Sequence, residues 1–232
     1  MKVIVTSGGT SEAIDSVRKI TNQSTGTLGK IIAEQLLEAG YLVTLVTTKN
    51  AVKPVRHINL EIKLIEATAD LAQVLEVEVP KHDAIVHAMA VSDYQPVVML
   101  PIEDFKSKLS AMEDLQLLSN QDKKVSSKAE TQVIVLKKTP KLISKIKAWQ
   151  PEILLIGFKL LVGVSDEALI SAAKKSLIDN QADFIFANDL ENITADTHAG
   201  WLVGRNSLEK VTTREAIGQL IVSKIKQVSE EN

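Results

Sequence analysis

Two glycine-rich loops of phosphate-binding type lie close together near the start of the chain. The first, Gly8-Gly9-Thr10, directly follows an apolar run, and the second carries Ser24, Gly26 and Gly29 at the start of an amphipathic stretch. Glycine lets the backbone approach a ligand closely, and a helix start offers free N–H groups and a positive dipole end to an anion. The two loops together predict a site for phosphate chemistry, although the first pair alone could be a simple turn and Ser24 alone could cap the helix.

Arg18 and Asn22 lie between these two loops. A guanidinium group can hold a carboxylate or phosphate with two hydrogen bonds, and a side-chain amide can hold a carbonyl or a developing oxyanion. Either residue alone is most often a surface or turn residue. Their position between two anion-binding loops favours a direct part in the chemistry.

A third segment with candidate ligand contacts follows the apolar run that ends at His87, and it contains Met89, Ala90 and Asp93. The carboxyl ends of strands form the ligand-binding edge of open α/β sheets. Asp93 could therefore accept hydrogen bonds from a ligand, or it could equally cap a turn. Farther along, Lys124 lies in a lysine-rich run that could close over phosphates, although a solvated run is the commoner explanation.

The elements that must position these residues alternate along the chain. Short apolar runs predict strands over residues 3–6, 42–47, 62–66, 84–87, 133–136, 153–156 and 184–187. Amphipathic stretches predict helices over residues 28–39, 68–79, 140–149, 165–180 and 213–228, and Thr139 is expected to cap the third of them. This order predicts an α/β fold with a doubly wound (Rossmann-like), mostly parallel sheet and helices on both faces.

Two stretches interrupt the alternation. Residues 93–131 are polar and irregular, with a weak helix around 112–118, and such an insertion is usually a lid, an oligomerisation arm or disorder. Residues 190–212 have the pattern of a β-hairpin. We expect a single domain over residues 1–232 that carries both features.

Composition excludes several kinds of site. The chain has 232 residues and a formal net charge of −2, so no overall field attracts nucleic acid or an anionic membrane. It has no cysteine, which excludes disulfides and zinc–sulfur sites, and its four histidines lack metal-ligand spacing. We expect a soluble, cytoplasmic protein, because the chain shows no targeting segment and no apolar stretch near the roughly 20 residues that span a bilayer.

Two other nucleotide-binding classes compete with an active site for phosphate transfer. An NAD(P)-dependent reductase should have a G-x-G-x-x-G fingerprint and an acidic residue closing the second strand, whereas this chain has Val46-Thr47-Thr48-Lys49 there. The Gly-Lys-Ser/Thr end of a P-loop is also missing. A non-catalytic nucleotide-binding module stays open, since it explains the loops without a use for Arg18, Asn22 or Lys124.

A series of motifs resembles phosphopantothenate–cysteine ligase (phosphopantothenoylcysteine synthetase) of coenzyme A biosynthesis, in its stand-alone bacterial form. The motifs are Thr6-Ser7-Gly8-Gly9-Thr10, the segment from Arg18 to Gly29, Ala88-Met89-Ala90-Val91-Ser92-Asp93, Lys137-Lys138-Thr139-Pro140, Ile156-Gly157-Phe158 and Ala187-Asn188-Asp189. The resemblance implies a ligase that joins 4′-phosphopantothenate to cysteine with Mg²⁺ and a nucleoside triphosphate, CTP being favoured over ATP. The carboxylate would first form an acyl-nucleotidylate and pyrophosphate, and the amine of cysteine would then displace the nucleotide.

The resemblance also implies roles for individual residues. Nucleotide contacts fall to Gly8, Ser24, Gly26, Gly29, Pro140, Phe158, Lys175 and Asn188. Phosphopantothenate contacts fall to Asn22, Met89, Ala90 and Asp93. The implied catalytic residues are Asn22, which would hold the acyl carbonyl, Lys124 on a mobile loop, and Arg18, which would reach the site of the other subunit. A homodimer follows, with the 93–131 insertion and the 190–212 hairpin forming a small antiparallel dimerisation layer. No metal ligand is assigned.

Overall fold

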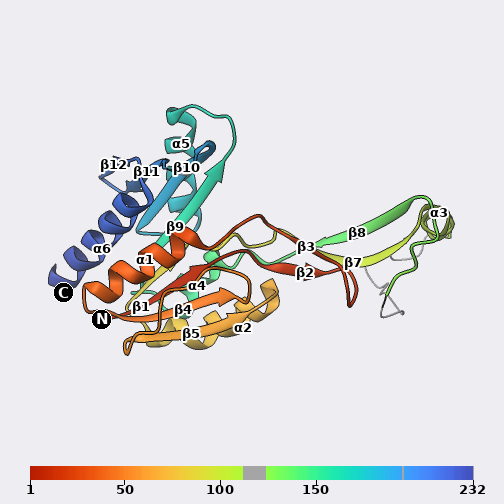
Figure 1. Ribbon diagram of the computed structural model, residues 1–232. Coiled ribbons are helices and arrows are strands. Elements are labelled where there is room, and N and C mark those ends of the chain that lie inside the picture. The colour runs from red at the N-terminus through yellow and green to blue at the C-terminus, as the bar shows by residue number, and fades with distance from the viewer. Residues whose placement is uncertain (112–123, 195, 232) are drawn as a thin grey trace.

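An eight-stranded sheet forms the centre of the molecule, in a computed structural model that describes residues 1–111, 124–194 and 196–231 (Figure 1). Its strand order is β12-β11-β10-β9-β6-β1-β4-β5. The strands are β1 (Lys2–Ser7), β4 (Leu42–Thr48), β5 (Leu60–Ile65), β6 (Ala84–His87), β9 (Leu154–Leu161), β10 (Phe184–Ile193), β11 (His198–Gly204) and β12 (Leu208–Val211). All neighbours from β10 to β5 pair in parallel, whereas β11 and β12 are antiparallel. The predicted α/β fold is confirmed.

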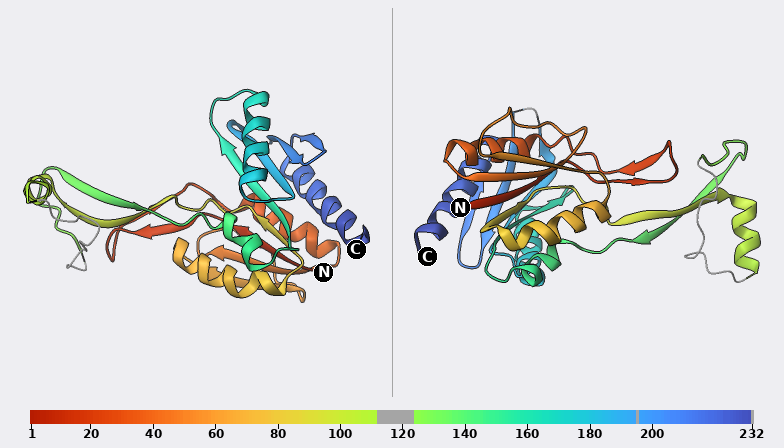
Figure 2. Two further views of the ribbon diagram at one scale, coloured as in Figure 1. Left: turned by 180° about the vertical axis from the view of Figure 1, so that it is seen from behind. Right: turned by 90° about the horizontal axis from the view of Figure 1, so that it is seen from below.

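Helices cover both faces of this sheet (Figures 1 and 2). One face carries α1 (Thr27–Glu38) and α6 (Arg214–Glu231), and the other carries α2 (Thr68–Glu78), α4 (Ile143–Trp149) and α5 (Asp166–Asp179), with a 3₁₀ turn, η1 (Val79–Lys81), after α2. Successive residues of β1 serve the two cores in turn: Val3 and Val5 pack with α1 and α6, and Ile4 packs with α2 and α5. In the part of the chain that the structure describes, no helix is long and apolar enough to cross a membrane.

The sheet changes its winding direction between β1 and β6. Strands β4 and β5 lie on one side of β1, and β6, β9 and β10 follow on the other. The loops after β1 and β6 join through a bridge between Gly9 and Ala90, in which Ala90 N donates to Gly8 O at 2.9 Å and Thr10 N donates to Ala90 O at 3.1 Å. Ligands of open α/β sheets bind at such a switch point.

Two small antiparallel sheets extend from the edge of the main sheet where β1 and β6 end. A short hairpin pairs β2 (Ser11–Ala13) with β3 (Lys19–Thr21), and a longer arm pairs β7 (Tyr94–Pro101) with β8 (Gln132–Lys138). Figures 1 and 2 show the arm projecting from the body, with α3 (Ile102–Ser110) at its far end. The arm contains the described part of the predicted insertion, and the helix expected over 112–118 lies outside the described residues.

Three sequence-based expectations differ from this architecture. The strand expected over 133–136 exists, but it belongs to the arm and not to the main sheet. The helix expected from Pro140 begins at Ile143, because the Thr139 hydroxyl donates to the Ser92 carbonyl at 2.5 Å and caps no helix. The hairpin within 190–212 forms β11 and β12, which extend the main sheet instead of joining the arm in a separate layer.

Candidate functional site

The two glycine loops form one cradle at the carboxyl end of β1. The Ser7 hydroxyl donates to Gly26 O at 3.0 Å, and Gly8 and Gly26 both have positive φ angles, of 88° and 79°. A Cβ at Gly26 would lie 2.9 Å from the Ala51 Cβ, and one at Gly29 would lie 2.5 Å from the Ser7 Cβ. Only glycine therefore allows the start of α1 to pack against β1 this closely.

No side chain caps the start of α1. Gly26 is the N-cap residue, and the first turn contains no acidic residue. The Leu28 and Gly29 N–H groups donate to no acceptor within the described residues. Ser24 is exposed and does not cap the helix, so its hydroxyl and these N–H groups can meet an anion.

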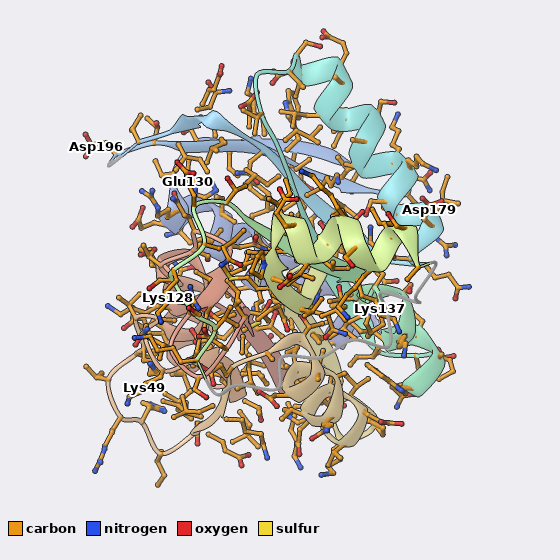
Figure 3. The ribbon with its side chains drawn as sticks, turned by 90° about the vertical axis from the view of Figure 1, so that its right-hand side faces the viewer. Lys49, Lys128, Glu130, Lys137, Asp179 and Asp196 are labelled. Atoms are coloured by element: carbon orange, nitrogen blue, oxygen red, sulfur yellow. The ribbon has the colours of Figure 1, made fainter. Side chains whose placement is uncertain are left out.

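The loop after β4, to which none of the sequence motifs assigns a role, completes the cradle. A Cβ at Gly8 would lie 2.9 Å from the Ala51 Cβ and 3.1 Å from the Thr48 hydroxyl. Lys49, which is exposed on this loop and labelled in Figure 3, adds a positive charge. The signal in the sequence was its position at the carboxyl end of a parallel strand.

Asn22 lies beside the cradle. Its carbonyl oxygen is 2.7 Å from the position of a Cβ on Gly9, and the neighbouring Thr21 hydroxyl donates to Thr10 O at 3.0 Å. The exposed Asn22 side chain makes no hydrogen bond to any residue that the structure describes. Its amide is therefore available to a ligand next to the glycine loops.

Arg18 lies at the other end of the β2–β3 hairpin, about 13 Å along the strand from Asn22 at the usual rise per residue. Its guanidinium pairs with Asp15 at 2.6 Å and donates to Val125 O at 2.8 Å. These contacts hold the Asp15 pKa well below its usual range, with the Arg18 hydrogen bond as the largest cause. Within one chain Arg18 therefore lies apart from Asn22, whereas Lys124 is the sequence neighbour of Val125, which Arg18 contacts.

The loop after β6 brings its predicted residues to the same edge in different ways. Ala90 pairs with Gly9, but the Met89 side chain is buried in the core, so only its backbone faces the switch point. The exposed Asp93 carboxylate accepts no hydrogen bond from the described chain, so it caps no turn. Its carbonyl accepts from Thr139 N at 2.9 Å, which puts Pro140 beside it.

A hydroxyl network fixes these loops to one another. The Thr10 hydroxyl donates to the Ser92 hydroxyl at 2.9 Å and accepts from Ser92 N at 2.8 Å. The Thr68 hydroxyl and N–H both donate to the buried Glu12 carboxylate, at 2.7 and 2.9 Å. The first glycine loop, the β6 loop and the start of α2 are therefore tied together.

Phe158 and Asn188 lie farther along the same edge. Phe158 is half-buried on the α1 face of the sheet, with its ring centroid 5.4 Å from that of Phe186. Asn188 shares this face by strand alternation, and its Nδ2 lies 3.2 Å from Nε2 of His198. The apolar ring of Phe158 and the buried amide of Asn188 together provide a surface of the kind that binds the base and sugar of a nucleotide.

Lys175 is not brought to this site. It lies on α5, which packs on the opposite face of the sheet, and it forms an exposed ion pair with Asp179 at 3.1 Å. Asp179, labelled in Figure 3, marks the end of this helix. Because α5 runs back from the ligand-binding edge, its third turn points away from the cradle.

The described residues contain no group of three or more His, Asp or Glu side chains that could bind a metal ion.

Comparison with known proteins gives the family. The model of the DNA/pantothenate metabolism flavoprotein C-terminal domain matches residues 1–122 and 99–228. A solved DNA/pantothenate metabolism flavoprotein from Streptococcus pneumoniae is 52% identical, with a TM-score of 0.93, and the match covers 98% of this chain and 99% of that one. The coenzyme A biosynthesis bifunctional protein CoaBC of Thermococcus kodakarensis is 34% identical over 94% of this chain and 49% of its own length.

A more distant structure has the same fold. A Cab2 mutant in complex with phosphopantothenate-cysteine is 17% identical, with a TM-score of 0.74 over 99% of this chain and 88% of that one. This chain spans about half the length of the bifunctional relative. On the family match, which covers most of its residues, the chain belongs to the DNA/pantothenate metabolism flavoprotein C-terminal domain family.

Proposed function

We propose that this chain is a phosphopantothenate–cysteine ligase, which makes phosphopantothenoylcysteine for coenzyme A biosynthesis. The observation that carries the proposal is the cradle of two glycine loops at the switch point, with the free amide of Asn22 beside it. Family membership supports it, as do the coenzyme A biosynthesis role named for the bifunctional relative and the phosphopantothenate-cysteine bound by the Cab2 mutant.

The first half-reaction forms a mixed anhydride. An oxygen of the phosphopantothenate carboxylate attacks the α-phosphorus of the nucleotide, a C–O–P linkage forms, and the bond to the β-phosphate breaks to release pyrophosphate. The N–H groups of Leu28 and Gly29, the dipole of α1 and the charge of Lys49 stabilise the negative charge on the phosphates. Ser24 adds a hydroxyl donor.

The second half-reaction forms the amide. The amine of cysteine attacks the activated carbonyl, its proton is lost, and the nucleoside monophosphate leaves with the former carboxylate oxygen. Asn22 donates its side-chain N–H to the carbonyl oxygen, whose negative charge grows as the amine attacks. Ala90 and Asp93 line the side of the cradle where phosphopantothenate binds, and Met89 contributes only its backbone there, because its side chain is buried in the core.

CTP is the proposed nucleotide, with ATP as the alternative, and Phe158 and Asn188 receive its base and sugar. Mg²⁺ would arrive on the triphosphate, where it keeps most of its water ligands and shields phosphate charge. The described residues form no metal cluster, so no side chain is assigned to this ion.

The active form is proposed to be a homodimer. Arg18 and Asp15 hold the backbone of Val125, and with it the neighbouring Lys124, at the tip of the β2–β3 hairpin, away from the cradle of their own chain. The projecting arm of β7 and β8 lies next to this hairpin (Figure 1). A second copy packed on the arm would let both basic side chains reach its phosphates.

The test is pyrophosphate release in the presence of phosphopantothenate, cysteine, Mg²⁺ and either CTP or ATP. Release that depends on phosphopantothenate, followed by amide formation that depends on cysteine, is expected. Silence with both nucleotides would overturn the proposal. Nucleotide binding without release would favour the non-catalytic module, and hydride transfer from NAD(P)H would favour the reductase.

A further inference from the structure

His198 and Asn188 form a buried polar pair near the point where β10 stops pairing with β9. Asn188 is 4% exposed and His198 is 8% exposed. His198 opens the antiparallel strand β11, which brings its ring next to the end of β10, and Asn188 Nδ2 lies 3.2 Å from His198 Nε2. Both side chains lie on the face of the sheet that α1 and α6 cover.

The direction of this hydrogen bond follows from the charge of the ring. Burial, together with the positive charge of Arg214, lowers the pKa of His198 to about 4, so the ring is neutral at neutral pH. An amide nitrogen can only donate, so Nε2 accepts and the ring proton lies on Nδ1. Nδ1 is enclosed without a hydrogen-bond partner in the described residues. The Asn188 amide is therefore the only hydrogen-bond partner that the ring has among them.

The bond leaves the oxygen of the Asn188 amide unused. Oδ1 accepts no hydrogen bond from any described residue, and it is not among the polar atoms that are enclosed without a partner. It therefore keeps contact with solvent. The bond to His198 thus fixes the orientation of the amide and leaves Oδ1 as an acceptor for a ligand.

The position of this acceptor indicates which part of a nucleotide it meets. Asn188 lies three strands from β1, about 14 Å from the glycine cradle at the usual strand spacing. The base is the end of a nucleotide that lies farthest from its phosphates. With phosphates at the start of α1 and the sugar near Phe158, the base comes to Asn188.

We propose that His198 is a positioning residue that holds Asn188 Oδ1 toward the base, so that the site selects a base with an exocyclic amino group. An amino group donates to Oδ1, whereas a carbonyl at the same position would leave two acceptors facing one another. The inference rests on the proposed function for the presence and direction of the nucleotide.

The test measures the binding of four nucleotides by calorimetry: CTP against UTP, and ATP against inosine triphosphate. The members of each pair differ by an amino group or a carbonyl at one position and by a proton on the neighbouring ring nitrogen. The unmodified protein should bind the amino member about tenfold more tightly or better in at least one pair. His198→Phe should lose most of this preference, and His198→Gln, which keeps an acceptor for Asn188, should retain much of it. His57→Gln, at an exposed histidine, is the matched control.

A second measurement does not depend on variants that fold. Nitrogen NMR of the unmodified protein should find the His198 ring neutral, with its proton on Nδ1. A proton on Nε2 would reverse the Asn188 amide and overturn the proposal, as would equal binding in both pairs or an unchanged preference in folded His198→Phe. Selective binding without pyrophosphate release would instead reject the ligase and leave this inference standing.

Discussion

Oδ2 of Asp15 accepts a hydrogen bond from the Arg18 guanidinium at 2.6 Å and another from the Val125 N–H at 3.0 Å. Arg18 in turn donates to the Val125 carbonyl at 2.8 Å. One carboxylate and one guanidinium thus clamp the segment that carries Lys124 onto the tip of the β2–β3 hairpin.

Removing the charge of Asp15 should release Arg18 and the segment that carries Lys124. We expect Asp15→Asn to lower the rate of pyrophosphate release between roughly 10- and 100-fold, because small displacements of catalytic groups are costly. Asp179→Asn, which breaks an exposed ion pair on α5, should leave the rate unchanged. An unaltered rate in folded Asp15→Asn would mean that the clamp has no part in the reaction.

The crowding at Gly26 predicts a loss of nucleotide binding on substitution. Gly26→Ala and Gly40→Ala both force alanine into a positive φ, near 79° and 85°, and this backbone strain alone should destabilise each fold by about 1 kcal/mol. Only Gly26 is crowded, since nothing lies within 4 Å of a Cβ at Gly40. Calorimetry should therefore show weaker nucleotide binding for Gly26→Ala alone. Equal binding by both variants would argue against the cradle.

Asn22→Ala should separate the two half-reactions. Since its amide is proposed to stabilise the carbonyl oxygen during amide formation, the variant should release pyrophosphate slowly and accumulate acyl-nucleotidylate. Rapid-quench chromatography of the intermediate measures this directly. An equal loss in both half-reactions would indicate that Asn22 only binds substrate.

The clamp also predicts which inactive variants can restore one another in mixed dimers. Arg18 and Lys124 lie together, so they serve the same site, and mixing Arg18→Ala with Lys124→Ala should restore no activity. Asn22 lies at the opposite end of the hairpin, and mixing Arg18→Ala with Asn22→Ala should restore activity at one of two sites. The reverse pattern, with mixed dimers verified by mass spectrometry, would reject a site shared in this way.

His87 predicts a loss of stability in mild acid. Burial lowers its pKa from about 6.5 to about 4, so the unfolded chain binds the proton more readily. The neutral His87 ring makes its full contribution to the free energy of unfolding above pH 6.5. That free energy falls by about 3 kcal/mol as the pH falls toward 4. Urea unfolding across this range should show a shallower pH dependence for His87→Asn than for the unmodified protein or for His57→Asn. Identical slopes would contradict the assignment.

The central sheet was largely predictable from sequence because its strands are buried on both faces and read as unbroken apolar runs. The β2–β3 hairpin was not predictable, because its strands, Ser11–Ala13 and Lys19–Thr21, are short and polar. Hydrogen bonds from Ser11 N to Glu66 O and from the Thr21 hydroxyl to Thr10 O hold it in place. The start of α4 was missed for a similar reason, since the Thr139 hydroxyl has a tertiary partner that no local pattern reveals.

The candidate site was predictable where backbone shape decides it. Gly8 and Gly26 adopt positive φ angles, which favour glycine, so the residue type itself marks these positions in the sequence. The roles of Ala51, Asp15 and His198 depend on contacts between distant segments, and nothing in their local sequence indicates them. The resemblance assigned Lys175 to the nucleotide, but α5, which carries it, packs on the other face of the sheet.

The projecting arm is anchored to the body of the molecule at its base. Thr139 bonds Ser92 through its hydroxyl and Asp93 through its N–H, so both strands of the arm enter the body at one rigid point. Ser92 is bonded in turn to Thr10, next to Gly9. A force on the distant end of the arm, near α3, would therefore displace the phosphate cradle, and in the proposed homodimer the same contacts would carry that displacement from one copy to the other.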